Sequence, residues 1–244
     1  PKLSGAYGNL GTMYLVNGRL NEAQPWLQRG LDVLIAMGDQ RSVVYQSRLH
    51  NLGRLALERE DLAAAAPRLT ESLQLRRATL GDRHERTAVA LLALASLSLL
   101  QAQPERALTQ ASEALEIARD PKAAAESLLP GALLTLAEAH ATLGQPDQAR
   151  TRLSEFEDST GTMTDRQRGP WRIQEGNARY LLGELDAAAA AYRDAIVAYG
   201  GASCTHPSCA QATLRLARIA VDRGDLAEAR THFAQAAPIL SATL

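Results

Sequence analysis

A small residue returns along the chain at a nearly constant interval. The positions, which we call the anchors, are Gly11, Gly53, Ala95, Ala137, Gly176 and Ala217. Successive anchors lie 42, 42, 42, 39 and 41 residues apart. An internal period of this size is typical of stacked helical hairpins, in which each unit buries its apolar face against its neighbours. The repeat therefore predicts the fold class before any single residue is considered.

Two further positions keep the same register. An alanine follows each anchor by twelve residues, and an apolar, mostly larger, residue follows it by sixteen: Leu27, Leu69, Ala111, Leu153, Tyr192 and Phe233. In the second unit Leu49, Leu52 and Ala56 form one helical stripe, and a second stripe follows the polar turn at 58–61. The pattern predicts two antiparallel helices per unit, packed closely because Gly53 and Ala65 are small.

The expected architecture is all-α, a right-handed α-solenoid superhelix of about six antiparallel helix pairs. The units are expected at 4–37, 46–79, 88–120, 130–158, 169–200 and 210–243, in one array over residues 1–244. The apolar run from Thr87 to Leu100 is too short to span a bilayer and predicts a buried helix. Because the first unit begins almost at once, we expect the chain to be part of a longer protein.

The charge balance and the cysteine content argue against several classes of protein. The chain has 26 basic and 27 acidic residues, so it has no global field that would hold nucleic acid or an anionic membrane. Its two cysteines are too few for a disulfide scaffold, which fits a reducing compartment. We expect a cytoplasmic protein with neither a nucleic-acid nor a membrane partner.

Few residues suggest chemistry. Cys204, His206 and Cys209 are interpreted as part of a linker, with a local disulfide or a metal clip as alternatives, since a structural zinc site needs four ligands. The five histidines show no metal-binding pair, and His140 is expected to pack in the core. The glycines at 5–11 have the wrong spacing for a phosphate loop. We therefore predict no enzyme activity, no metal and no cofactor.

The fifth unit departs from the pattern. Arg172 and Arg179 stand where apolar or small residues are expected, after a Gly/Thr-rich linker at 158–165 and a shortened interval. We expect a register irregularity or a mobile break in that linker. With Arg166 and Arg168 these arginines are interpreted as a solvated face, the alternative being a site for an acidic partner.

The repeated residues resemble the tetratricopeptide repeat (TPR). In the first unit the matches are Tyr7, Leu10, Gly11, Tyr14, Gly18, Ala23, Leu27 and Gly30, and in the last they are Leu216, Ala217, Gly224, Ala229, Phe233 and Ala236. The 42-residue spacing and the linker 80–85, with His84 and the corresponding His206-Pro207, resemble the kinesin-light-chain-like subclass. The resemblance implies a protein- or peptide-binding scaffold whose first helices line a concave surface.

Counting from the anchors places residues on that surface. The expected peptide-binding residues are Asn9, Thr12, Asn51, Arg54, Glu58, Ser96, Glu138, Asn177, Arg215 and Arg218. Asn9 and Asn51 resemble the groove asparagines of kinesin-light-chain-like repeats, whose amide offers an acceptor and two donors to an extended peptide. Arginines such as Arg54 could hold a carboxylate with two hydrogen bonds.

Two other functions stay open. One is a ligand-sensing regulatory domain that controls an attached effector, such as the kinases or transcription regulators of bacteria that carry similar arrays. The other is a self-assembling element with an apolar patch at an open end. The ligand, the effector and the oligomeric state are not determined by the sequence.

Overall fold

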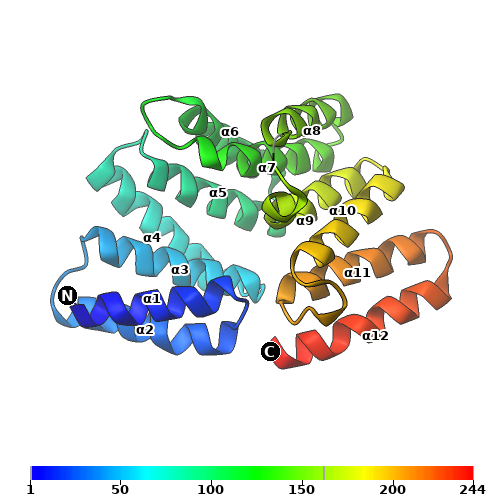
Figure 1. Ribbon diagram of the computed structural model, residues 1–244. Helices are drawn as coiled ribbons and strands as arrows, with labels where there is room; N and C mark the ends of the chain where they lie inside the picture. Colours follow the sequence, from blue (N-terminus) through cyan, green and yellow to red (C-terminus); the bar gives the residue numbers. More distant parts are fainter. Residues whose placement is uncertain (1, 162, 244) are drawn as a thin grey trace. The chain divides into compact units, whose positions relative to one another are not determined.

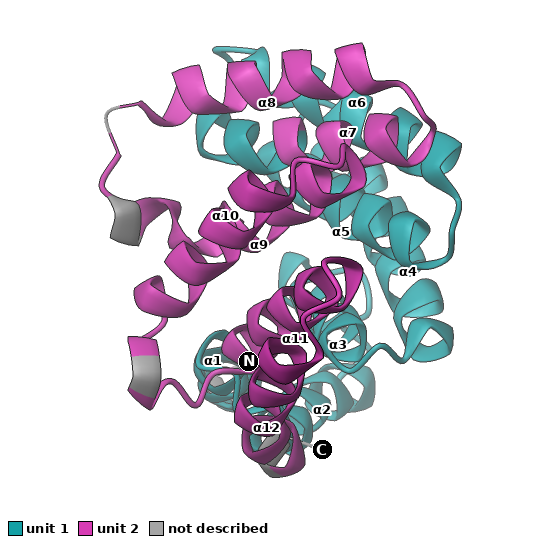
Figure 2. Ribbon diagram, turned by 90° about the vertical axis from the view of Figure 1, so that its right-hand side faces the viewer, with its two compact units in different colours: residues 1–132 teal, residues 133–244 magenta. Residues whose placement is uncertain are grey.

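The computed structural model describes residues 2–161 and 163–243, with side chains at all of these positions except 2, 165, 166, 202, 242 and 243. Within these residues the chain forms twelve α-helices and two short 3-10 helices, and no strand (Figure 1). The helices follow one another as packed pairs, which confirms the predicted all-α solenoid class. The chain divides into two compact units, residues 1–132 and 133–244 (Figure 2). The single array remains a prediction.

The first unit contains three helix pairs. Helix α1 (Lys2–Val16) packs on α2 (Leu20–Ala36), α3 (Val43–Glu58) on α4 (Leu62–Leu80), and α5 (Glu85–Leu100) on α6 (Pro104–Arg119), with η1 (Glu126–Leu128) after them. Helices α2 and α4 also pack on α3 and α5, which joins neighbouring pairs into continuous apolar cores. The predicted buried helix at Thr87–Leu100 is confirmed as α5.

The second unit begins inside α7 (Leu129–Thr142), which is followed by α8 (Pro146–Thr160). Helix α9 (Asp165–Leu181) packs on α10 (Leu185–Ala198), and α11 (Pro207–Asp222) packs on α12 (Leu226–Thr243). The 3-10 helix η2 (Gly201–Ser203) lies between α10 and α11. No helix among the described residues is both long enough and apolar enough to cross a membrane.

The repeat period has a direct packing cause. A Cβ added at the anchor Gly53 would lie 2.6 Å from Leu69, which is the residue sixteen positions later, on the partner helix. The same relation joins the other glycine anchors to Leu27 and Tyr192. Close packing forbids extra volume at such a contact, so a small anchor is paired with a larger residue. Leu69 is thus the side chain packed directly on Gly53, and Ala65, the other small residue predicted at this crossing, is fully buried.

The turn inside each pair also repeats. A residue seven positions after each anchor has a positive φ in all six pairs: Gly18, Glu60, Ala102, Gly144, Gly183 and Gly224. This left-handed conformation ends the first helix, and glycine adopts it without steric cost. Glu60 and Ala102 adopt this left-handed conformation although they carry a side chain, because the packed helices on either side fix the turn.

The linker histidines begin helices. The Nδ1 atom of His84 accepts a hydrogen bond from the backbone N–H of Arg86 at 3.0 Å, and that of His206 accepts one from Ser208 at 3.1 Å. Each imidazole thus caps the first turn of the helix that follows. The sequence predicted both residues as linker positions, and the structure adds this capping role.

The linker of the fifth unit lies partly outside the described residues, at position 162. On its far side Thr164 and Gln167 form a capping box at the start of α9. Two backbone hydrogen bonds satisfied in this way fix where the helix begins. The expected register irregularity or break in the linker 158–165 stays a prediction, because position 162 of that linker lies outside the described residues.

Candidate functional site

The first helices of unit 1 carry a cross-helix amide contact. Asn51 on α3 donates its Nδ2 hydrogen to Thr12 Oγ1 on α1 at 2.8 Å. Thr12 in turn donates to the backbone carbonyl of Gly8 at 2.7 Å, so the Asn51 amide is held in one orientation. Both side chains are half-buried. Among the described residues Asn51 makes no other hydrogen bond, which leaves its Oδ1 atom and one N–H for a ligand.

The other predicted residues of unit 1 are accessible to different degrees. Asn9, Arg54 and Glu58 are exposed and make no hydrogen bond or ion pair with the described side chains. Ser96 is half-buried and donates to the carbonyl of Leu92 in its own helix at 3.1 Å. Asn9 and Arg54 are therefore available to a ligand, and the hydroxyl hydrogen of Ser96 is not.

Unit 2 brings three polar side chains together. Asn177 on α9 donates its Nδ2 hydrogen to Glu138 Oε1 on α7 at 3.3 Å. Tyr192 on α10 donates its hydroxyl hydrogen to Asn177 Oδ1 at 2.9 Å. The Tyr192 side chain is fully buried, and Glu138 and Asn177 are half-buried. Two of the predicted peptide-binding residues, Glu138 and Asn177, are thus joined by a hydrogen bond, and Tyr192, identified in the sequence only as a larger residue of the repeat, is the third member.

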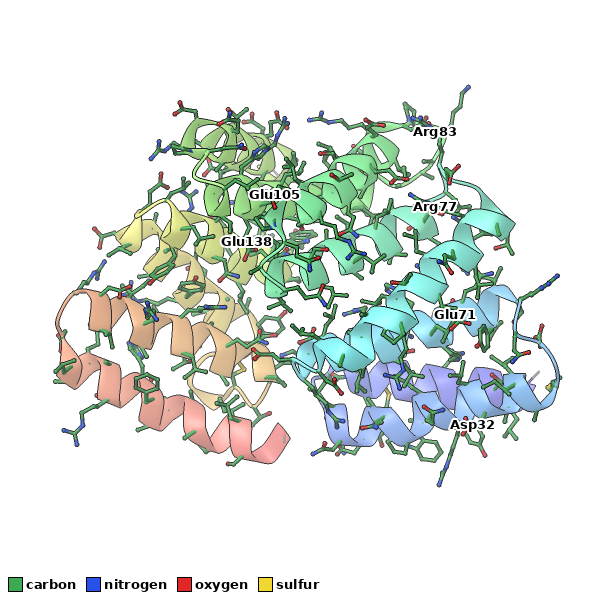
Figure 3. The ribbon with its side chains drawn as sticks, turned by 180° about the vertical axis from the view of Figure 1, so that it is seen from behind. Asp32, Glu71, Arg77, Arg83, Glu105 and Glu138 are labelled. Carbon is green, nitrogen blue, oxygen red and sulfur yellow. A yellow bond between two sulfur atoms is a disulfide. The ribbon has the colours of Figure 1, made fainter. Side chains whose placement is uncertain are left out.

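Burial raises the pKa of Glu138 from 4.5 to about 7. The positive charge of Arg215 on α11 and the hydrogen bond from Asn177 act in the opposite direction. Glu138 is labelled in Figure 3, on α7. A carboxyl group with this pKa exchanges its proton near neutral pH.

The two α11 arginines are not equivalent. Arg218 is exposed, and its Nε atom donates a hydrogen bond to Asp222 Oδ1 at 3.3 Å. Asp222 also accepts the hydroxyl hydrogen of Tyr180 at 2.5 Å. Arg215 is exposed and forms no ion pair with the described residues. Both arginines are accessible to a ligand, and they differ in that, within the described part of the chain, only Arg218 already contacts a carboxylate.

The arginines of the fifth unit are not a solvated face, and that interpretation is wrong. Glu175 is only 4% exposed and accepts from Arg172 Nη1 at 2.7 Å and from Arg179 Nε at 3.0 Å. Arg168 donates to the backbone carbonyl of Thr160 at 3.1 Å. The arginines replace apolar residues at these positions because they neutralise a buried carboxylate. The side chain of Arg166 lies outside the described residues.

The cysteines form a disulfide. Cys204 and Cys209 are joined across the start of α11, and both side chains are buried. The linker interpretation of this segment is incomplete, because the local disulfide that it held as an alternative is present. His206 lies inside the loop and its ring stacks on Tyr199, with ring centroids 4.6 Å apart. His140 is half-buried, with its Nδ1 atom 2.7 Å from Gln145 Oε1.

No group of three or more His, Cys, Asp or Glu side chains in the described part of the chain is arranged to hold a metal ion. The polar side chains brought together in each unit are amides, hydroxyls, single carboxylates and arginines. Such groups bind peptide backbones and charged side chains.

Four family models match the chain, each described as a tetratricopeptide repeat. They cover residues 3–36, 45–120, 130–155 and 173–242. Together these ranges include most of the sequence and each predicted helix pair. No curated protein matches the sequence.

Solved structures share the fold at low sequence identity. BtubC (BKLC) from P. vanneervenii is 19% identical with a TM-score of 0.61, over 66% of this chain and 64% of that protein, so the match spans less than two thirds of its length. The apo form of RapI is 12% identical with a TM-score of 0.70, over 99% of this chain and 84% of RapI. Kinesin-light-chain-like repeats from Podosopora anserina are 17% identical with a TM-score of 0.54, over 98% and 94% of the two chains. The family models, the helix pairs and the anchor packing agree, and the chain belongs to the tetratricopeptide repeat family.

Proposed function

We propose that this protein is a binding scaffold that holds an extended peptide segment of a partner on the first helices of its repeats, and that it catalyses no reaction. The observation that carries the proposal is the Asn51 amide, fixed by Thr12 and still able to donate and accept. A peptide backbone presents a donor and an acceptor in each residue, which such an amide matches. Because Asn51 is already oriented, little side-chain entropy is lost on binding.

The scarcity of acidic residues on the first helices of unit 1 favours an acidic peptide. Helix α1 has no acidic residue, and α3 and α5 have one each, Glu58 and Glu85. Arg54 is exposed between the predicted contacts Asn51 and Glu58. An exposed guanidinium that lacks a partner can bind a carboxylate with two hydrogen bonds. The ligand is therefore an extended segment with an acidic side chain opposite Arg54.

In unit 2 the remaining predicted contacts are proposed to act differently. The Asn177 amide already donates to Glu138 and accepts from Tyr192, so one of its N–H groups remains for a ligand. Glu138 and the nearby positive charge of Arg215 are then the groups that would distinguish between charged ligand side chains.

The test is selection of displayed random peptides on the protein, followed by affinity measurement on variants. The first variant is Asn51→Ala with Arg54→Ala, and the matched control is Gln74→Ala with Arg106→Ala. The control removes one amide and one guanidinium from exposed positions on the second helices α4 and α6.

Peptides selected on the parent protein should contain acidic residues and lose about 30-fold or more in affinity for the first variant. Loss of one neutral and one charged hydrogen bond costs about 2–4 kcal/mol, which gives this factor. Affinity for the control variant should not change. Equal affinity for the parent and the first variant would remove this face from the binding site.

A second function is favoured by the structural likeness to Rap proteins. One of these structures, 11% identical with a TM-score of 0.66, is a Rap protein complexed with competence and sporulation factor. By analogy, ligand binding to this chain would change its shape and so control an attached effector. Small-angle scattering with a selected peptide tests this, because a sensor changes its radius of gyration on binding and a passive scaffold does not.

A further inference from the structure

One guanidinium in unit 1 lies between three helices. Arg48 on α3 is 7% exposed. A Cβ added at Gly8 on α1 would lie 1.6 Å from its Cζ atom and 2.0 Å from Nη2, so the guanidinium occupies the space of a side chain at that position. A Cβ added at Gly30 on α2 would lie 3.5 Å from the Cδ atom of Arg48. Two glycines therefore make the space that this charge fills.

The charge has no counterpart in the described residues. Arg48 forms no ion pair and no hydrogen bond there, and its Nε atom is sealed from solvent without a partner. Helix α1, on which the guanidinium rests, has no acidic residue. Burial alone lowers the pKa of Arg48, without a charged neighbour contributing to the shift. Buried charges in proteins are ordinarily paired, so this arrangement lacks an anion.

A second buried arginine in the same unit has a structural role. Arg76 on α4 is 3% exposed, and its Nη1 atom donates to the backbone carbonyl of Arg86 at 2.6 Å. That bond fixes the start of α5 against α4. Arg48 makes no such contact, so its position is not explained by bonding within the unit.

The terminal nitrogens of Arg48 differ from Nε in their contact with solvent. Only Nε is sealed, whereas Nη1 and Nη2 make no hydrogen bond and keep contact with solvent. Because side chains on a helix lean toward its N-terminus, the space above Gly8 lies over the turn that contains Ser4 and Gly5. Ser4 is buried and donates to the carbonyl of Gly30 at 2.8 Å. Gly5 has open space where a side chain would stand.

From this geometry we infer that Arg48 is an anion-binding subsite that takes one carboxylate group, held end-on by Nη1 and Nη2 and reached past Gly5. A carboxylate fits because its two oxygens match two parallel N–H donors. The subsite belongs to unit 1 alone and requires neither the Asn51 amide nor the Arg54 contact. It therefore stands or falls separately from the peptide-binding function proposed above.

The test follows the side-chain Nε–Hε signals of the ¹⁵N-labelled protein by NMR, with sodium formate as the probe and sodium chloride at equal ionic strength as the reference. Sealing of Nε from water makes the Arg48 signal observable, and its absence from Arg48→Met assigns it. The signal of Arg76 is an internal control, because its Nε is equally sealed. Formate should shift the Arg48 signal saturably, and chloride should not.

Two variants distinguish a loss of formate access to Arg48 from a loss of folding. Gly5→Leu should abolish the formate response while the Arg48 signal stays in place, because an added Cβ at Gly5 meets no atom within 4 Å and the side chain would cover the inferred approach to Arg48. Arg48→Met should fold with the same circular dichroism and a melting temperature at least as high, since it removes an unpaired buried charge. A short capped peptide with one glutamate, used in place of formate, shows whether a peptide side chain also reaches the subsite.

Three results would overturn the inference. They are an Arg48 shift no larger than that of Arg76, an equal shift with chloride, and a full formate response in Gly5→Leu. A marked loss of stability in Arg48→Met would also count against it, because the guanidinium would then have a structural partner.

Discussion

The Glu138 carboxyl makes the stability of unit 2 depend on pH in a defined direction. Its pKa is about 7 in the folded protein and 4.5 in the unfolded chain. Between these values the folded carboxyl keeps its proton while the unfolded one loses it, so the free energy of unfolding falls as pH rises. The difference corresponds to about 3 kcal/mol, which is present below pH 4.5 and lost by about pH 8.

The perturbation is Glu138→Gln, which keeps the shape and the acceptor for Asn177 but cannot ionise. The variant should gain about 3 kcal/mol relative to the parent between pH 4.5 and pH 8, whatever constant difference separates the two proteins. Arg215→Gln should move the parent's transition to higher pH, because it removes the charge that favours the carboxylate.

The assay is urea denaturation at a series of pH values, followed by the fluorescence of Trp171 in a Trp26→Phe background. Trp171 lies on α9 in the same unit as Glu138, and Trp26 lies in unit 1. The comparison between proteins is necessary because His50 acts in the opposite direction. Burial lowers the pKa of His50 to about 3, so its contribution to stability is lost as pH falls. This effect is common to both proteins and cancels.

A difference between parent and variant that changes by less than about 1 kcal/mol over the range would refute the reasoning. So would a change of opposite sign. Either result would mean that the charge of Arg215 and the Asn177 hydrogen bond outweigh the burial of the carboxyl.

Three further predictions concern packing, the disulfide and a buried ion pair. Gly53→Ala should cost about 1–3 kcal/mol because its Cβ meets Leu69 at 2.6 Å, and Leu69→Ala should cost less in that background than in the parent, as a double-mutant cycle by urea denaturation would show. Cys204→Ala with Cys209→Ala should lower stability by up to about 2 kcal/mol, and a reducing agent should lower the melting temperature of the parent but not of the variant. Glu175→Gln should lower the free energy of unfolding by about 3–5 kcal/mol, because Arg172 and Arg179 both lose a buried carboxylate partner. A cost near zero in calorimetry would show that these ion pairs are not buried in solution.

The repeat architecture could be predicted from the sequence because its cause is local. A glycine anchor such as Gly53 and a larger residue such as Leu69 are sixteen residues apart in one helical hairpin, and their contact needs no information from other units. Six copies of this spacing define the helix pairs, their turns and the buried stripes. The family assignment rests on the same residues.

The candidate site was predictable only in part. Helix-face counting listed Asn51 and Thr12 for the same surface, and the structure joins them by a hydrogen bond. It listed Glu138 and Asn177 for the same surface, and the structure joins them by a hydrogen bond. It did not find Tyr192 as the third member, because that contact comes from a second helix.

Tertiary structure alone decided which charges are paired. The same residue type is neutralised at Arg172, where Glu175 lies one turn away on the same helix. Among the described residues Arg48 has no ion-pair partner, because α1 has no acidic residue and Glu22 and Asp32 of α2 interact with Arg19 and Gln28 instead. Sequence spacing cannot distinguish these cases, since the environment of a side chain is set by the helices that pack on it. The anchors determined where the helices lie, and the contacts between helices determined the chemistry of each charged residue.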